Sequence, residues 1–140
     1  MTADEVRAFA ARHIEHWQAR DAATIAADHA PDGVVESPSA GTHQGRQAIR
    51  KALQTWFDSL PDMRFPTEQI VADTDAAAIV VTVQGTQQGE FFGVPAAGQH
   101  LKFRMVLAQR FENGLITPEQ RIFDFTSVLA RLGVIKIRPS

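Results

Sequence analysis

Residues 100–126, HLKFRMVLAQRFENGLITPEQRIFDFT, hold two runs of β-branched and aromatic side chains on either side of Asn113-Gly114. Asn-Gly between two apolar runs is a strong signal for a two-residue β-hairpin loop. This stretch therefore predicts two long antiparallel strands, over 100–112 and 115–126. Residues 68–73 and 77–87 have a similar composition and predict two further strands.

The Asn113-Gly114 loop also predicts which side chains share a face of the sheet. If Glu112 faces Leu115 and no bulge interrupts the pairing, Phe103 faces Asp124. The resulting apolar face carries Phe103, Met105, Leu107, Gln109, Phe111, Ile116, Ile122 and Asp124, with Gln120 opposite Leu107. The opposite face carries Lys102, Arg104, Val106, Ala108, Arg110, Arg121, Phe123 and Phe125.

The N-terminal half predicts helices. Residues 4–19 and 46–60 repeat apolar side chains at three- and four-residue spacing, and residues 21–29 predict a shorter helix that ends before Pro31. Val34, Val35 and Glu36 predict a short strand. Helices first and strands afterwards indicate an α+β fold with an antiparallel sheet.

The composition bounds the function classes. The chain has 140 residues, a formal net charge of -2 and no cysteine, which predicts one domain over 1–140 without disulfides or cysteine-bound metal. This charge gives no indication of nucleic acid or an anionic membrane as a partner. The amphipathic N-terminus lacks the apolar core of a signal peptide, so we expect a cytoplasmic protein.

Asp124 lies between Phe123 and Phe125 and has two interpretations. On the predicted apolar face, burial would raise its carboxyl pKa, which suits a general acid or base near neutral pH. Alternatively, Asp124 is a buried acid that a helix terminus or an arginine satisfies.

The histidines and tryptophans also leave alternatives open. His13 is either a hydrogen-bonded core residue or a donor that faces a pocket, and Trp17 and Trp56 either fill the core or line a pocket. His13 and His16 are three residues apart, but no acid close in the sequence completes a metal site. The chain has no nucleophile elbow, phosphate loop or dinucleotide glycine pattern, so its chemistry is predicted to be acid–base catalysis or none.

The order of elements resembles the nuclear transport factor 2-like superfamily. Within it, GTQQGEFFGVPAAGQHLKFRMVLAQRFENGLI and DFTSVLARLG resemble the SnoaL-like polyketide cyclase branch. The resemblance implies three N-terminal helices packed on a curved antiparallel sheet that encloses a conical apolar cavity. It also implies that Asp124 is the acid/base of an aldol-type ring closure, although the histidine paired with that acid in the founding cyclases has no clear match.

Two function classes follow from the residues and the resemblance together. The first is a cyclase or isomerase that acts on a hydrophobic carbonyl compound without cofactor or metal, with Asp124 as the catalytic acid/base. The second is a non-catalytic protein that binds small molecules on the same scaffold. We expect a homodimer through the convex sheet face and a ligand site lined by His13, Trp17, Trp56, Phe103, Met105, Gln109 and Gln120.

Overall fold

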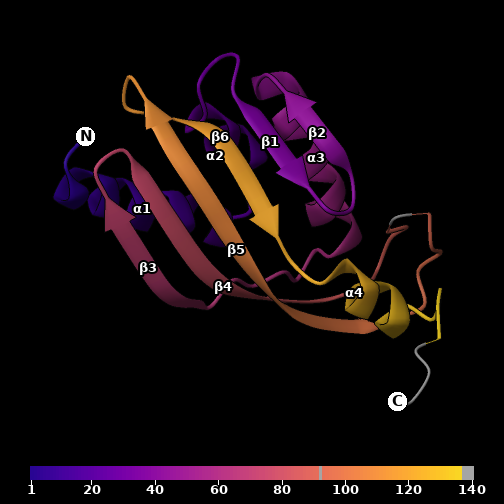
Figure 1. Cartoon of the computed structure of the whole chain (residues 1–140). Coiled ribbons are helices and arrows are strands. Elements are labelled where there is room, and N and C mark those ends of the chain that lie inside the picture. Colours follow the sequence, from indigo (N-terminus) through magenta and orange to yellow (C-terminus); the bar gives the residue numbers. More distant parts are fainter. Residues whose placement is uncertain (92, 137–140) are drawn as a thin grey trace.

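The computed structural model describes residues 1–91 and 93–136. Three helices, α1 (Ala3–Gln18), α2 (Ala22–Ala27) and α3 (Arg46–Ser59), lie behind one six-stranded sheet (Figure 1). The strands are β1 (Val34–Ser37), β2 (Gly41–Gln44), β3 (Thr67–Asp73), β4 (Ala76–Thr86), β5 (His100–Glu112) and β6 (Leu115–Ile122). Their order across the sheet is β2-β1-β6-β5-β4-β3, and all neighbours are antiparallel except β1 and β6. The predicted α+β fold is confirmed.

Two elements differ from the sequence prediction. Strand β2 was not predicted, and β6 ends at Ile122 rather than at residue 126. The chain after β6 turns into a fourth helix, α4 (Phe125–Arg131), which was not predicted from the sequence. Asp124 begins this helix as its N-cap, because its carboxylate accepts hydrogen bonds from the Ser127 amide and hydroxyl at 3.0 and 2.7 Å.

A bulge in the hairpin reverses the predicted faces of β6. Near the loop, Phe111 pairs with Ile116 as predicted, but beyond the bulge Gln109 pairs with Glu119. Thr117 and Pro118 together face Arg110 in between. Because proline has no N–H to donate to the ladder, a strand accommodates it at such an irregularity. One extra residue turns every later side chain of β6 to the opposite face.

The reversal exchanges the charged and apolar positions of this strand. Glu119, Arg121 and Phe123 point into the interior, where they are 0%, 8% and 8% exposed, whereas Ile122 is 54% exposed. Gln120 also lies outside, opposite Ala108. The prediction that Asp124 and Gln120 face the interior, with Phe123 and Arg121 outside, is therefore wrong.

Asp124 is exposed, and its environment is the opposite of the predicted one. Its hydrogen bonds from the Ser127 side chain and amide lower the pKa of its carboxyl, where the sequence interpretation expected burial to raise it. The carboxylate is therefore charged at neutral pH and stabilises the start of α4.

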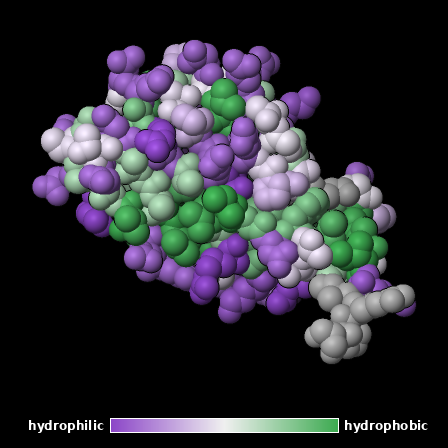
Figure 2. Space-filling view, viewed as in Figure 1, coloured by the Kyte–Doolittle hydropathy of each residue, from purple (hydrophilic) through white to green (hydrophobic). Residues whose placement is uncertain are grey.

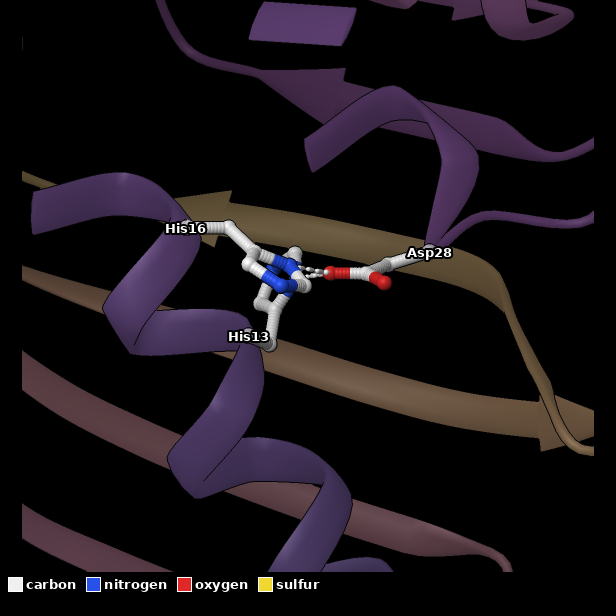
Figure 3. Close-up of side chains that lie close together, drawn as sticks. All are labelled: His13, His16 and Asp28. Carbon is white, nitrogen blue, oxygen red and sulfur yellow. Dashed lines mark hydrogen bonds and ion pairs between the residues drawn. The ribbon is translucent and has the colours of Figure 1, made fainter. Parts of the chain in front are cut away.

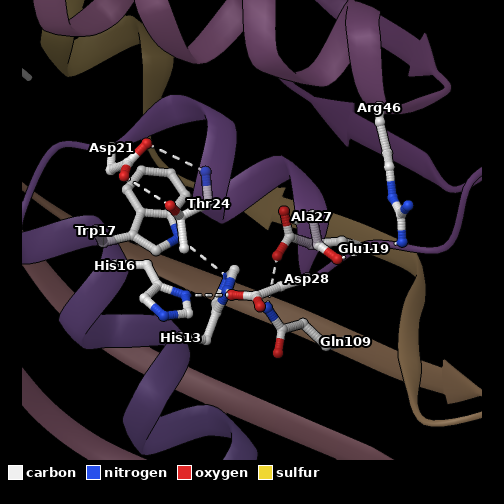
Figure 4. Close-up of polar contacts among 10 residues, drawn as sticks. All are labelled: His13, His16, Trp17, Asp21, Thr24, Ala27, Asp28, Arg46, Gln109 and Glu119. Atoms are coloured by element: carbon white, nitrogen blue, oxygen red, sulfur yellow. Dashed lines mark hydrogen bonds and ion pairs between the residues drawn. The ribbon is translucent and has the colours of Figure 1, made fainter.

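The interior has an aromatic end and a polar end. Towards α4, the rings of Trp56, Phe91, Phe103 and Phe123 contact one another. Towards the hairpin loop, Gln109 and Glu119 project from β5 and β6 into the layer of α1 and α2 (Figure 4). Trp17, which is 2% exposed, also lies in this core.

Replacement of Asp124 by alanine should destabilise the fold, because the Ser127 amide loses its acceptor. A lost N-cap corresponds to a fall in melting temperature of about 4 °C in a domain of this size. Asp124→Asn should be nearly neutral, since asparagine also caps helices well. Thermal unfolding followed by circular dichroism at pH 7 measures both changes.

Asp21→Ala is the matched control, because Asp21 caps α2 through the same pair of bonds to Thr24. A clear gain in stability in Asp124→Asn would contradict the capping role and support a desolvated carboxyl.

Candidate functional site

Glu119 is the centre of the polar end of the interior. Its carboxylate has no exposed surface, accepts a hydrogen bond from the Gln109 amide at 2.6 Å and pairs with Arg121 Nε at 3.0 Å. Burial alone would raise its pKa, but the charge of Arg121 beside it lowers the pKa to about 2. Glu119 is therefore a carboxylate at neutral pH. The Arg121 guanidinium also lies over the Trp17 ring, 5.1 Å from its centre.

His29 lies beside this carboxylate and is fully buried. Backbone bonds between residues 28–30 and Ile116 of β6 hold the segment, and Arg46 donates to the His29 carbonyl at 2.9 Å. Neither ring nitrogen has a hydrogen-bond partner in the part of the chain that the structure describes. Burial lowers the pKa of His29 to about 4, so the ring is neutral at physiological pH.

His13 belongs to a chain of hydrogen bonds that reaches the surface (Figures 3 and 4). His13 Nδ1 and His16 Nδ1 each lie 2.7 Å from the same oxygen of Asp28, and Trp17 donates to His13 Nε2 at 3.0 Å. The Trp17 N–H can only donate, so His13 Nε2 must be an acceptor and Nδ1 must carry the proton. The network thus fixes His13 as a neutral Nδ1–H tautomer with both nitrogens occupied.

Unpartnered polar atoms surround the Glu119 carboxylate. Besides His29, the Gln109 amide oxygen and Arg121 Nη2 are buried and lack hydrogen-bond partners among the described residues. Leaving buried donors and acceptors unpaired is costly, and natural proteins usually reserve such groups for water, an ion or a ligand. The set offers both donors and acceptors in an otherwise apolar interior, which is the composition of a small-molecule site.

The structure brings together some of the predicted site residues and separates others. His13, Trp17 and Gln109 lie at the polar end, and Trp56, Phe103 and Met105 line the interior beside it. Asp124 and Gln120 lie on the surface, for the reason given above. The enclosing apolar cavity stays a prediction, since aromatic side chains occupy that part of the interior.

Sequence reasoning missed the groups that surround the carboxylate. Glu119 and Arg121 were assigned to the wrong face or to none, and Pro118 within the strand was the signal that could have corrected this. Asp28 completes the His13–His16 pair from another helix, so sequence spacing could not reveal it. His29 carries no motif, and only its position after a short helix hints at burial.

No helix among residues 1–91 and 93–136 combines the length and apolar character needed to span a membrane. Comparison with proteins of curated function finds no match. Many solved structures share the fold.

Two of these structures come from Streptomyces and exceed one quarter identity. AclR from Streptomyces galilaeus, named as a candidate hydroxylase, is 26% identical with a TM-score of 0.82, covering 97% of this chain and 100% of its own. IdmH from Streptomyces antibioticus, named as a candidate polyketide cyclase, is 29% identical with a TM-score of 0.75, covering 91% and 98%. TerC, crystallised with polyporic acid, shares the fold at 18% identity and a TM-score of 0.74, covering 92% and 98%.

The family model of the SnoaL-like polyketide cyclases matches residues 7–132, nearly the whole length of the chain. Together with the α+β architecture and the shared fold, this match shows that the chain belongs to the SnoaL-like polyketide cyclase family.

Proposed function

We propose that the chain is a cyclase or isomerase that removes a proton next to the carbonyl of a hydrophobic compound, using its own side chains as acid and base. One observation carries the proposal: Glu119 is ionised and fully buried, and unpartnered donors lie around it. A buried carboxylate with hydrogen-bond donors beside it can act as a base while those donors stabilise the charge that develops on the substrate.

Arg121 would keep the charge balanced during the reaction. In the free protein its guanidinium compensates Glu119. As the proton moves to Glu119, negative charge develops on the substrate oxygen, where Arg121 Nη2 can donate. The same cation thus stabilises the charge before and after proton transfer, and the low pKa of Glu119 rises as its partner turns to the new anion.

His29 would donate a second hydrogen bond to this oxygen. A neutral imidazole has one N–H, and its low pKa keeps it neutral so that it polarises the carbonyl without giving up a proton. The apolar body of the substrate would lie at the aromatic end, against Trp56, Phe103 and Met105. TerC, which shares the fold, was crystallised with polyporic acid, which supports a small-molecule ligand for this scaffold.

The family resemblance makes Asp124 the competing candidate for the base. Its exposure and its two bonds to Ser127 argue for a capping role instead. The two carboxylates can be separated by matched amide substitutions.

Deuterium incorporation next to the carbonyl of 2-tetralone and 2-acetonaphthone, measured by NMR in D2O, tests the proposal. We expect the protein to accelerate exchange above buffer, and Glu119→Gln to lose at least about 100-fold of that acceleration. Asp124→Asn should keep it within a few-fold. Loss in Asp124→Asn with activity kept in Glu119→Gln would assign the base to Asp124.

Glu119→Gln leaves Arg121 buried without its anion, which costs about 3–5 kcal/mol when one partner of a buried pair is removed. The double variant Glu119→Gln with Arg121→Met removes both charges and serves as the folded reference.

If both ketones quench tryptophan emission but neither exchanges deuterium faster than in buffer, the chain is a binder rather than an enzyme.

We further propose a homodimer through the outer face of the sheet. Figure 2 shows hydrophobic side chains gathered across the sheet on this face. Val71 and Ile122 are 49% and 54% exposed, and Val106 pairs with Ile122 beside them. A hollow of about 480 Å³ on this face is lined by Val71, Ala78 and Ala108 and flanked by Asp73 and Arg110.

A second copy fits this surface because its opposite charges can pair across a two-fold axis. In the sheet, Ala76 pairs with both Asp73 and Arg110. A two-fold axis near Ala76 would therefore set Asp73 of one copy against Arg110 of the other and cover the hollow beside them.

Sedimentation velocity at about 10 µM checks the dimer, at a concentration where a stable interface of standard size is occupied. The native chain should sediment as a dimer, and Ile122→Lys should shift it to monomer. Ala11→Lys, which places the same charge on the exposed side of α1, is the matched control and should stay dimeric. A native monomer would refute this interface.

A further inference from the structure

Three side chains at the polar end have the composition of a metal site. His13, His29 and Glu119 each offer one ligand atom, and the three atoms lie within 4.8 Å of one another. All three residues are fully buried. His29 adds an independent observation, because both of its ring nitrogens lack a hydrogen-bond partner within residues 1–91 and 93–136.

We propose that His13, His29 and Glu119 bind a divalent first-row transition metal, with Zn²⁺ the ion that their two imidazoles and one carboxylate suit best. Imidazole and carboxylate are ligands that such ions share. Three protein ligands leave a coordination position for water or a substrate oxygen. The inference does not rest on the proposed proton transfer, and in the metal-bound protein Glu119 would be a ligand rather than the free base.

Hydrogen bonds from neighbouring residues already orient two of the three ligands, His13 and Glu119. Asp28 accepts from His13 Nδ1, which directs the lone pair of Nε2 to the interior. A carboxylate behind a ligating histidine is the usual outer partner at metal sites. Gln109 likewise holds one oxygen of Glu119.

Metal binding would displace one contact of the metal-free protein and leave another in place. Trp17 N–H, now 3.0 Å from His13 Nε2, would give way to the metal. Arg121 can stay on Glu119 Oε2, since each carboxylate oxygen has two lone pairs. Hydroxide at the open position would offset one of the two added positive charges, because a bound metal lowers the pKa of its water.

A second group competes for the same histidine. His13, His16 and Asp28 also lie within 4.8 Å of one another through their ligand atoms (Figure 3). That group is already satisfied without a metal, because Asp28 accepts a hydrogen bond from both histidines. His29 has no such partner for either ring nitrogen among the described residues, so the group that contains His29 is the better candidate.

Zinc content after overnight incubation and desalting, measured by mass spectrometry, tests the proposal. We expect about one Zn²⁺ per chain in the native protein and in His16→Leu. His29→Leu, which keeps an apolar volume in place of the ring, should weaken binding by roughly 100-fold or more, since it removes a direct ligand.

Cobalt(II) absorption of the native protein provides a second measurement that needs no variant. Intense visible bands of a four- or five-coordinate ion are expected, with quenching of Trp17 emission. A weak spectrum like that of the aqueous ion, no retained zinc, or loss of zinc in His16→Leu would overturn the assignment.

Discussion

A carboxylate with no exposed surface must be compensated, and much of the interior of this protein is organised around that requirement. Glu119 is held by Arg121 and Gln109, and Arg121 in turn lies over the Trp17 ring. Removing one charge would leave the other buried and unpaired, which is far more costly than losing a surface pair. The chain therefore keeps an ion pair in a place where an apolar pair would pack as well, which points to use rather than stability.

Helices α1 and α2 add hydrogen bonds that constrain His13. Asp28 ends α2 and receives two histidines from α1, while Trp17 occupies the remaining nitrogen of His13. These bonds fix both the orientation and the proton of His13. His29, one residue after Asp28, makes no such hydrogen bonds. Of the two central histidines, it is the one whose ring nitrogens lack partners among the described residues. The contrast separates a histidine whose hydrogen bonds are complete from one whose nitrogens remain available within a single cluster.

Much of the fold could be predicted from the sequence, because periodicity and turn chemistry are local signals. The helices over 4–19 and 46–60 and the strands over 68–73, 77–87 and 100–112 agree with the structure within a residue or two at their ends. The site could not be predicted in the same way. Its position depends on one irregularity at Pro118, and alternation along a strand transmits that single error to every residue beyond it.

Asp124 shows the limit of an uninterrupted strand register. The hairpin register predicted burial of Asp124, but Phe123 is the residue that enters the core, and Asp124 follows it as a helix cap. Asp28 shows the reverse case, since nothing near it in the sequence indicates that two histidines converge on it.

The bulge at Pro118 has a consequence for how relatives of this chain can diverge. Residues 119–124 carry two different sets of side chains in alternation, and the pairing decides which set is internal. One set presents a carboxylate, a guanidinium and a phenyl ring, and the other an amide, an aliphatic chain and a carboxylate. Loss or gain of a single residue before this segment would exchange one internal chemistry for the other while leaving the backbone path of the sheet nearly unchanged. A scaffold of this kind can acquire a new reaction by an insertion or deletion in one strand, without a series of substitutions in its core.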